Sequence, residues 1–469
     1  MAWKLEEILA ATGGAVEREG TRKMFGEVVT DSARVKKGAV FVALKGERLD
    51  GHAFAGAAVR RGATCVVAHR DLPRIAVRRA TVVRVPDTLR ALGDLAHFRR
   101  EKFAPKVLAI TGSNGKTTTK EMVAAIFEEA VIKGQAMRGK VLKTQGNFNN
   151  LIGLPLTLLR LSQKDQIAVV ELGTNRPGEI ARLAEIADAD CAIVTSVAAA
   201  HLEGLNSLAG VAHEKGALYR KLRAEGTIAV NLDDPIVRRL GGKSKHRKIT
   251  YGSRGQVRAR AARRHNAGGM EFILQAKRQR RKVRLNYLGR HNVTNALGAA
   301  ALALAAGAKL PAICRGLEKS RPFAMRMEAS SWRGIAIIND AYNANPASMK
   351  AALRTLAEAG GRGESVAVLG DMFELGKRSR QEHGALGKEI AKAGIDRVYL
   401  LGAQASLVRK GALGAGMKAE RVVIGESHAD IAQQLGRRLK SGDCVLFKGS
   451  RGMAMEKILD QLQRRGLGA

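Results

Sequence analysis

The stretch T-G-S-N-G-K-T-T-T, residues 111–119, carries the residue types that hold a nucleoside triphosphate. Its glycines let backbone N–H groups turn toward phosphate oxygens, Lys116 supplies a positive charge for the outer phosphates, and Thr117 offers a hydroxyl to Mg²⁺. Ile110 stands where the general G-x-x-x-x-G-K-[ST] pattern has its first glycine, so the loop is the shorter G-x-x-G-K-T. An ordinary strand-to-helix turn is the alternative. The loop predicts ATP contacts from Gly112, Ser113, Asn114, Gly115, Lys116, Thr117 and Thr118.

Three other side chains have types and positions suited to phosphate chemistry. Glu171 ends an apolar run, where a carboxylate could hold Mg²⁺ or be simply solvated. His201 follows a second apolar run, and a single histidine is more often structural than a ligand. Lys215 lies in the helix-like A-H-E-K-G-A-L-Y-R, where a solvated lysine would be equally ordinary. These alternatives stay open on the residues alone.

Short apolar runs alternate with helix-like segments along the whole chain, which is typical of α/β domains whose parallel sheets are covered on both faces. At roughly 150 residues per domain, 469 residues predict about three domains. We expect a small N-terminal α/β domain over residues 1–102, a central parallel-sheet domain over 103–320 and a third α/β domain over 321–469. Ligands in such sheets bind at the carboxyl ends of the strands.

The composition excludes several classes of protein. Hydrophobic residues make up 45 % of the chain and charged residues 26 %, values that are ordinary for a globular protein. No apolar run approaches the ~20 residues of a membrane-spanning helix, and the first residues lack the apolar region of a signal peptide. The four cysteines form no C-x-x-C pair, and Cys65, Cys191 and Cys444 lie in apolar runs. We expect a cytoplasmic protein with buried thiols and without a zinc or redox site.

The formal net charge of +37 is unusual, and much of it is concentrated between residues 236 and 290. Such a charge attracts polyanions, including nucleic acid, anionic lipid and nucleotides. The stretch has no nucleic-acid recognition motif and no aromatic residues for base stacking. A solvated basic surface and a functional polyanion or membrane contact both remain open. A nucleic-acid-binding protein would show salt-dependent retention of RNA or DNA and no amino-acid-dependent ATP turnover.

Motifs along essentially the whole chain, in order, resemble those of the Mur ligase family, which builds the peptidoglycan peptide. The matching segments are T-G-S-N-G-K-T-T-T at 111–119, E-L-G at 171–173, A-H-L-E at 200–203, G-R-H-N-V-T-N-A-L at 289–297, D-A-Y-N-A-N-P at 340–346, L-G-D-M-F-E-L-G at 369–376 and F-K-G-S-R-G at 447–452. The resemblance implies an N-terminal domain that binds UDP, a central ATPase-like P-loop domain and a Rossmann-like C-terminal domain.

Within the family, the chain is most similar to enzymes that add D-alanyl-D-alanine to UDP-N-acetylmuramoyl-tripeptide. The segments that carry this similarity include T-D-S at 30–32, F-V-A-L-K-G-E-R at 41–48, D-G-H at 50–52 and T-Q-G-N-F-N-N at 144–150. The D-N-P-R motif usual in the ligase for a third-position diamino acid is absent. A folylpolyglutamate synthetase would lack the N-terminal segments, and an inactive homologue would be expected to lose Lys116, Glu171 or Lys215.

The resemblance implies a reaction in which the tripeptide carboxylate attacks the γ-phosphate of ATP, and the dipeptide amine then attacks the acyl phosphate. It implies catalytic roles for Lys116, His201 and Lys215, and two Mg²⁺ ions held by Thr117, Glu171, His201 and Lys215. Lys215 is the candidate for N6-carboxylation by CO₂. The lysine stands in A-H-E-K-G-A, residues 212–217, where the family pattern is closer to A-K-A-K-G-E.

The resemblance also assigns binding residues and partners. Further ATP contacts fall on Asn292, Asn295, Arg326 and Asp340. Arg326 stands in A-M-R-M, where the family usually has K-G-R-M. Substrate contacts fall on Thr30, Asp31, Ser32, Gly46, Thr144, Asn147, Asn149, Asn343 and Asn345. The expected partners are UDP-N-acetylmuramoyl-tripeptide and D-alanyl-D-alanine, with no specific nucleic acid and with the protein a monomer.

Overall fold

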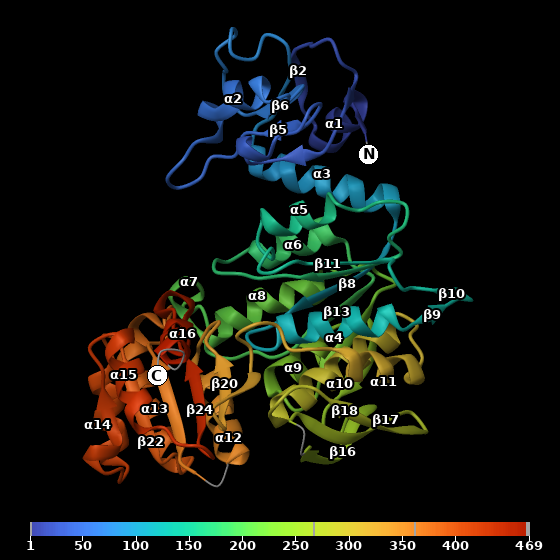
Figure 1. Ribbon diagram of the computed structural model, residues 1–469. Coiled ribbons are helices and arrows are strands. Elements are labelled where there is room, and N and C mark those ends of the chain that lie inside the picture. Colours follow the sequence, from blue (N-terminus) through green and yellow to red (C-terminus); the bar gives the residue numbers. More distant parts are fainter. Residues whose placement is uncertain (1, 266–267, 361–362, 466–469) are drawn as a thin grey trace.

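The computed structural model describes residues 2–265, 268–360 and 363–465. Three α/β parts follow one another along the chain, each built on its own sheet. The N-terminal part lies at the top of Figure 1, and the central part joins it through α3 (Thr88–Phe103). The C-terminal part packs beside the central one. The mixed α/β class expected from the sequence is confirmed.

The N-terminal sheet has the strand order β2-β7-β6-β5-β4, with β2 antiparallel and the rest parallel. Its strands are β2 (Ala15–Arg18), β4 (Val28–Val29), β5 (Val40–Val42), β6 (Cys65–Ala68) and β7 (Thr81–Arg84). Helices α1 (Leu5–Thr12) and α3 pack on one face and α2 (Ala55–Arg60) on the other. Asp87 begins α3 by accepting hydrogen bonds from the backbone N–H groups of Leu89 and Arg90.

The central sheet has nine strands in the order β11-β12-β8-β13-β14-β15-β16-β17-β18. Its parallel strands are β8 (Lys106–Thr111), β11 (Val141–Lys143), β12 (Ile167–Glu171), β13 (Cys191–Val194), β14 (Thr227–Asn231) and β15 (Arg247–Tyr251). One face is covered by α4 (Lys116–Glu128), α10 (Arg290–Ala305) and α11 (Leu310–Lys319). The other is covered by α5 (Gly153–Leu158), α6 (Glu179–Ala187), α8 (Leu208–Arg220) and α9 (Pro235–Lys243).

The central sheet extends beyond the parallel strands expected from the sequence. Three more strands extend it: β16 (Val257–Arg264) continues parallel from β15, and β17 (Met270–Ala276) and β18 (Gln279–Leu285) pair antiparallel. The basic run from 243 to 284 therefore belongs largely to strands. In these strands buried apolar residues such as Phe272 and Leu274 alternate with exposed ones, and they pack in the core beneath α10 and α11. The many arginines and lysines made this alternation hard to recognise in the sequence.

The C-terminal sheet has the order β19-β20-β24-β21-β22-β23, parallel except for β19. Its strands are β19 (Glu328–Trp332), β20 (Ile335–Asp340), β21 (Ser365–Gly370), β22 (Arg397–Leu401), β23 (Val422–Ile424) and β24 (Cys444–Lys448). Helices α12 (Pro346–Ala359), α13 (Ser379–Lys392) and α14 (Ala405–Gly414) cover one face. Helices α15 (His428–Arg438) and α16 (Glu456–Arg465) cover the other.

Short elements complete the chain. They are β1 (Trp3–Lys4), β3 (Met24–Phe25), β9 (Val131–Ile132), β10 (Gln135–Ala136) and α7 (Leu202–Leu205), and the 3-10 turns at Ser32–Arg34, Gly51–Phe54, Gly376–Arg378, Ala419–Arg421 and Arg451–Met453. Cys65, Cys191 and Cys444 are buried free thiols as expected, and Cys314 is a fourth. Among the described residues, none of the helices has both the length and the apolar character that crossing a bilayer requires.

Candidate functional site

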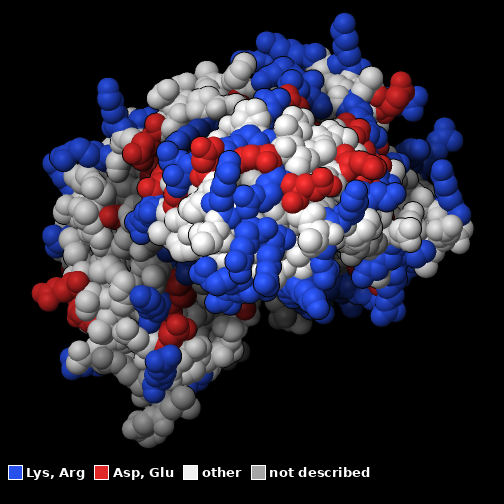
Figure 2. All heavy atoms as spheres, turned by 90° about the horizontal axis from the view of Figure 1, so that it is seen from above, with Lys and Arg blue, Asp and Glu red and all other residues white. Residues whose placement is uncertain are grey.

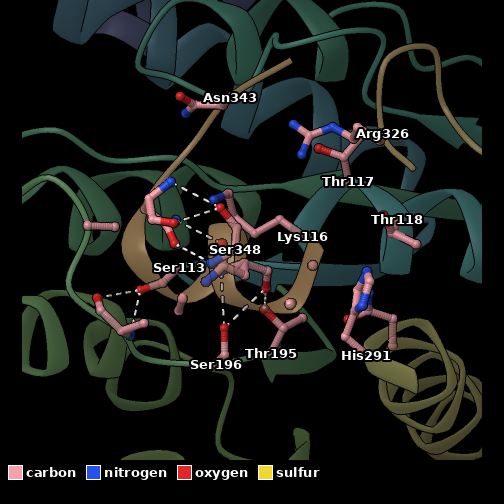
Figure 3. A pocket seen from close by; sticks show the side chains of 18 of the residues that line it. Ser113, Lys116, Thr117, Thr118, Thr195, Ser196, His291, Arg326, Asn343 and Ser348 are labelled. Carbon is pink, nitrogen blue, oxygen red and sulfur yellow. Dashed lines mark hydrogen bonds between the residues drawn. The ribbon is translucent and has the colours of Figure 1, made fainter. Parts of the chain in front are cut away.

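A cavity of about 420 Å³ opens between the central and C-terminal parts. The central part contributes the loop before α4, the segment between β13 and α7, and the first two turns of α10. The C-terminal part contributes Arg326, the segment 340–348, and Phe373 with Glu374. Figure 3 shows the loop residues in the middle of the view, with Asn343 and Arg326 above them and His291 below.

The loop before α4 requires glycine at two positions. Gly112 has φ +149°, and a Cβ there would lie 1.9 Å from Thr195 Oγ1. Gly115 has φ +82°, and a Cβ there would lie 2.3 Å from Asn295 Oδ1. Gly115 also precedes α4 without a side-chain cap, so the first N–H groups of the helix have no side-chain acceptor at this cavity. The site therefore has the form of an anion cradle.

The segment after β13 fixes the shape of this loop. Ser113 N–H donates to Ser196 O at 2.8 Å, and Asn114 N–H donates to Ser196 Oγ at 3.1 Å. The hydroxyl of Thr195 donates to Asn114 O at 2.5 Å. These bonds join the carboxyl ends of β8 and β13, which are neighbours in the sheet. The loop is therefore held in place by the sheet edge at which such folds bind ligands.

Lys116 folds back over its own loop, and its ammonium donates to Gly112 O at 2.8 Å. Burial lowers the pKa of Lys116 and nearby Arg326 lowers it further, while Glu171 and Glu374 oppose the shift. A triphosphate in the cradle would supply the negative charge that favours the ammonium form.

Glu171 ends β12 with one carboxylate oxygen in use and one unpartnered. Asn149 Nδ2 donates to Oε1 at 2.8 Å, while Oε2 is buried without a hydrogen-bond partner. A buried unpaired carboxylate oxygen is costly unless a cation meets it. Thr117, 3 % exposed, is the second residue of α4, the helix that follows β8, and β8 is a neighbour of β12 in the sheet. In the described part of the chain, no group of three or more His, Cys, Asp or Glu residues could hold a metal. Glu171 and Thr117 nevertheless fit Mg²⁺ whose other ligands are phosphate and water.

Lys215 lies inside α8 and is only 1 % exposed. Burial brings its pKa well below the usual value, and the charge of Lys116 adds to this effect, with Glu214 opposing it. Glu214 also accepts hydrogen bonds from Gly178 N–H at 2.7 Å and Ile180 N–H at 2.6 Å. Glu214, a position at which this chain departs from the family pattern, therefore accepts hydrogen bonds from the N-terminal N–H groups of α6.

His201 and Glu374 connect the two walls of the cavity. His201 Nδ1 lies 2.6 Å from Glu374 Oε2, and this close contact lowers the pKa of Glu374. Both residues have left-handed backbones, with φ of +55° and +62°. The backbone N–H of Glu203 also donates to Glu374 O at 3.2 Å. Left-handed backbone at non-glycine residues is uncommon and tends to occur at functional sites.

The first two turns of α10 present two asparagines to the cavity. Asn295 Nδ2 donates to Asn292 Oδ1 at 2.9 Å, and Asn292 Nδ2 donates to Leu288 O at 2.7 Å. His291 stands beside them, and burial lowers its pKa to about 4, so the ring is neutral at pH 7. This wall is therefore polar and uncharged at neutral pH.

Arg326 and Tyr342 form a flat surface on the C-terminal wall. The guanidinium carbon lies 4.1 Å from the ring centroid of Tyr342, a cation–π distance. Arg326 Nε is buried without a hydrogen-bond partner. The neighbours Met325 and Met327 have φ of +58° and +51°, so the arginine lies on a strained turn. The arrangement leaves Arg326 a free donor for an anionic or carbonyl oxygen.

Two further contacts complete the C-terminal wall. Lys448 Nζ lies 2.5 Å from Asp340 Oδ2 and donates to Asn343 O at 2.9 Å. Asn345 caps α12 through Ser348 N–H, and its Nδ2 donates to Asn114 Oδ1 at 2.8 Å. Asn345 therefore joins α12, in the C-terminal part, to the phosphate loop.

The structure divides the predicted site residues into three groups. Those that line the cavity are Ser113, Asn114, Gly115, Lys116, Thr117, Thr118, His201, Asn292, Asn295, Arg326, Asp340, Asn343 and Asn345. Those outside its lining but in the central part are Gly112, Thr144, Asn147, Asn149, Glu171 and Lys215. Those in the N-terminal part are Thr30, Asp31, Ser32 and Gly46. Their functional roles stay predictions.

Several lining residues were not predicted from the sequence. They include Ser196, Asn231, Asp234, His291, Tyr342, Glu374 and Lys448. Four of them, at positions 291, 342, 374 and 448, stand within motifs that resemble the family, so their signal was present. Asp234 reaches the site by capping α9 and accepting from Val197 N–H at 2.9 Å, which no motif indicated.

Comparison with known proteins gives matches in all three parts. Residues 25–100 match the sequence model described as "Mur ligase family, catalytic domain". Residues 110–303 match "Mur ligase middle domain", and residues 325–451 match "Mur ligase, glutamate ligase domain". UDP-N-acetylmuramoyl-tripeptide–D-alanyl-D-alanine ligase of Escherichia coli is 37 % identical, covering 96 % of each chain. The Bacillus subtilis protein of that name is 35 % identical, covering 93 % of this chain and 92 % of its own.

Solved structures agree along the full length. A crystal structure of MurF from Acinetobacter baumannii has a TM-score of 0.90 at 32 % identity, covering 99 % of both chains. MurF ligase from Thermotoga maritima, in complex with ADP, has a TM-score of 0.83 at 28 % identity and covers 94 % of this chain and 98 % of its own.

Proposed function

The chain belongs to the Mur ligase family, and we propose that it joins D-alanyl-D-alanine to UDP-N-acetylmuramoyl-tripeptide with hydrolysis of ATP to ADP and phosphate. The full-length relatives at 35 % and 37 % identity carry this activity in their names. The observation that carries the proposal is the single cavity that brings the phosphate loop, His201, Asn295 and Arg326 together. Amide formation from a carboxylate requires a leaving group, and a phosphate cradle beside polar binding walls is suited to provide it.

In this proposal, the loop and the first turn of α4 bind the β- and γ-phosphates through backbone N–H groups. Lys116 leaves Gly112 O and pairs with the outer phosphates, and Arg326 neutralises charge from the opposite wall. Asn292 and Asn295 contact the adenine side, and Asp340 the ribose. Mg²⁺, held through Thr117 and Glu171, would add charge neutralisation at the phosphates. The tripeptide carboxylate then takes the γ-phosphoryl group, and attack by the dipeptide amine releases it as phosphate.

We propose Lys215 as a carboxylated lysine. Its burial favours the neutral amine, which is the form that reacts with CO₂. The product is an anionic carbamate that, with His201, would hold a second cation. The same burial would disfavour a permanent ammonium group at this position.

The N-terminal part is proposed to hold the UDP end of the substrate through Thr30, Asp31, Ser32 and Gly46. Asp31 already organises its turn by accepting from Ala33 N–H at 2.9 Å. Thr144, Asn147 and Asn149, in the segment between β11 and α5, are proposed to contact the peptide, and Asn343 and Asn345, which line the cavity, to contact the dipeptide. We propose that the protein acts in the cytoplasm, where ATP is found, and that it is a monomer.

The test is phosphate release from ATP and Mg²⁺ with UDP-N-acetylmuramoyl-tripeptide, measured with and without D-alanyl-D-alanine. We expect release to depend on both acceptor and dipeptide. Lys116→Ala should abolish it, while Lys164→Ala, at an exposed lysine of the same part, should retain it. Release that is independent of the dipeptide would refute the assignment.

A further inference from the structure

The proposed reaction does not explain the basic run of residues 243–284. Within this run, strands β16–β18 form a face that is exposed and rich in Lys and Arg. Between residues 256 and 285 the chain has ten Lys and Arg residues and a single acid, Glu271. Strand register places six of the cations on one face: Arg258, Arg260, Arg263, Arg280, Lys282 and Arg284. The opposite face packs under α10 and α11.

The cations form two rows on either side of β17. Register pairs Arg263 and Arg284 across Glu271, and Arg258 and Arg280 across Gln275. Neighbouring strands are roughly 4.8 Å apart, so the rows lie roughly 10 Å apart. Between them lies Ile273, an aliphatic side chain that is 38 % exposed.

The contacts on this face leave most of its charge uncompensated. Hydrogen bonds from Lys282, Arg263 and Arg284 lower the pKa of Glu271 to about 2, so one carboxylate serves three cations. Arg258 and Arg260 donate to Gln275 Oε1, at 3.3 and 3.1 Å. Gln275 is neutral, so these two bonds orient the guanidinium groups without reducing their charge.

Protection of a sheet edge does not account for the pattern. Lysine and arginine on an edge strand discourage edge-to-edge pairing, which would explain β18 alone. Strand β16 lies inside the sheet, between β15 and β17, and still carries Arg258, Arg260 and Arg263. The hairpin turn between β17 and β18 also places Lys277 at φ +53°, where glycine or asparagine is favoured. Positive charge is therefore present where local structure gives no reason for it.

We propose that the β16–β18 face is a peripheral docking surface for the anionic phospholipid headgroups of a membrane. A three-stranded face with cations on its two outer strands and an exposed aliphatic residue on its middle strand fits a headgroup layer. Each cation near such a surface contributes independently to binding. A single-stranded nucleic acid would instead favour aromatic side chains for stacking, and Phe272, the one Phe, Tyr or Trp of residues 256–285, is buried on the inner face.

The location of the face is compatible with an active enzyme on a membrane. In the sheet order, β16 is separated from the loop-bearing strand β8 by β13, β14 and β15. The hairpin lies at the bottom of Figure 1, on the side away from the N-terminal part. Figure 2, viewed from above that part, shows Lys and Arg interspersed with Asp and Glu. The surface inference does not depend on the proposed ligase activity.

The experiment measures co-sedimentation of the full chain with vesicles of phosphatidylglycerol and phosphatidylcholine, against vesicles of phosphatidylcholine alone. We expect binding only to the anionic vesicles, weakening as salt is raised. The test variant is Arg258→Gln/Arg260→Gln/Arg280→Gln, which leaves the Glu271 contacts in place. It should reduce the partition coefficient on the order of tenfold or more.

The matched control is Lys392→Gln/Lys410→Gln/Lys418→Gln, which removes three exposed cations from the C-terminal part and changes the net charge equally. It should bind within about twofold of the unmodified chain. Equal loss in both variants would show that net charge alone drives binding and would overturn the proposal. Unchanged binding of the test variant, or tighter binding of an RNA oligonucleotide than of anionic vesicles at equal salt, would also overturn it. Circular dichroism and ATP turnover of both variants confirm folding.

Discussion

Nδ1 of His201, at the start of α7, lies 2.6 Å from Oε2 of Glu374, which stands 173 positions later in the loop after β21. Both residues have left-handed backbones, so the contact joins two strained turns from different parts of the chain. The bond between Asn114 and Asn345 is a second link across the same cavity. The cavity therefore depends on how the C-terminal part sits against the central one.

Glu374→Gln should lower kcat by about 10- to 100-fold, the usual effect of removing a partner that orients a ligating or catalytic histidine. The charge of Glu374 holds the His201 ring in place, and glutamine keeps the shape without the charge. Since Glu374 is not proposed to bind adenine or ribose, KM for ATP should change by less than about threefold. Steady-state phosphate release measures both parameters.

The matched control for Glu374 is Glu420→Gln, at an exposed glutamate in the C-terminal part, which should behave as the unmodified chain. An unaltered kcat in Glu374→Gln would show that the contact with His201 is incidental to turnover.

Asn345 has two separable roles. Asn345→Ser keeps an oxygen that can cap α12, but the shorter side chain loses the bond to Asn114. It should weaken turnover with little change in melting temperature. Asn345→Ala should lose both and cost about 1 kcal/mol of stability. Thermal unfolding and kinetics of the pair separate the roles, and equal turnover in Asn345→Ser and the unmodified chain would count against the link.

Lys215→Ala should lose activity because the proposed carbamate ligand is gone. Short carboxylates such as formate or acetate should partly restore turnover by occupying the vacated space. Lys221→Ala, at the partly exposed residue that follows α8, is the control and should remain active. Full activity of Lys215→Ala without added carboxylate would remove this lysine from the site.

His291 should make stability depend on pH in a defined window. Its folded pKa of about 4 lies below the ordinary value of 6.5, so the unfolded chain binds the proton more readily between these values. Stability should therefore fall as pH drops from 6.5 toward 4, by roughly 2 to 3 kcal/mol from this group. Chemical denaturation of His291→Asn at pH 7.5 and 5 should show a smaller loss than the unmodified chain. Equal losses would mean that the histidine is not buried as described.

The sequence predicted the parallel strands because each is a short, uninterrupted apolar run, as in β8 and β12. It missed the β16–β18 extension because those strands have one buried face and one basic face. Arginine and lysine on the outer face dominated the composition, and the inward set from Met270 to Ala276 was read only as part of a charged stretch. A strand with one strongly charged face still alternates apolar and charged residues, but its overall composition looks like that of a solvated charged segment.

The phosphate loop was predictable because all its parts are contiguous in sequence. The opposing wall was not, since Glu374 reaches His201 only through the packing of two sheets. Nor could residue types show that Lys215 is buried or that Glu171 keeps an unpartnered oxygen. Burial lowers the pKa of Lys215 and leaves one oxygen of Glu171 without a partner, and burial is a property of the assembled fold.

The most direct test of the account uses tripeptide substrate with both oxygens of its terminal carboxylate labelled as ¹⁸O. If that carboxylate attacks the γ-phosphate, one labelled oxygen bridges carbon and phosphorus and leaves with the phosphate, while the other stays in the new amide. Mass spectrometry should then find one ¹⁸O in the released phosphate for each pentapeptide formed. Unlabelled phosphate, or label in AMP, would contradict activation of the carboxylate at the Lys116 loop.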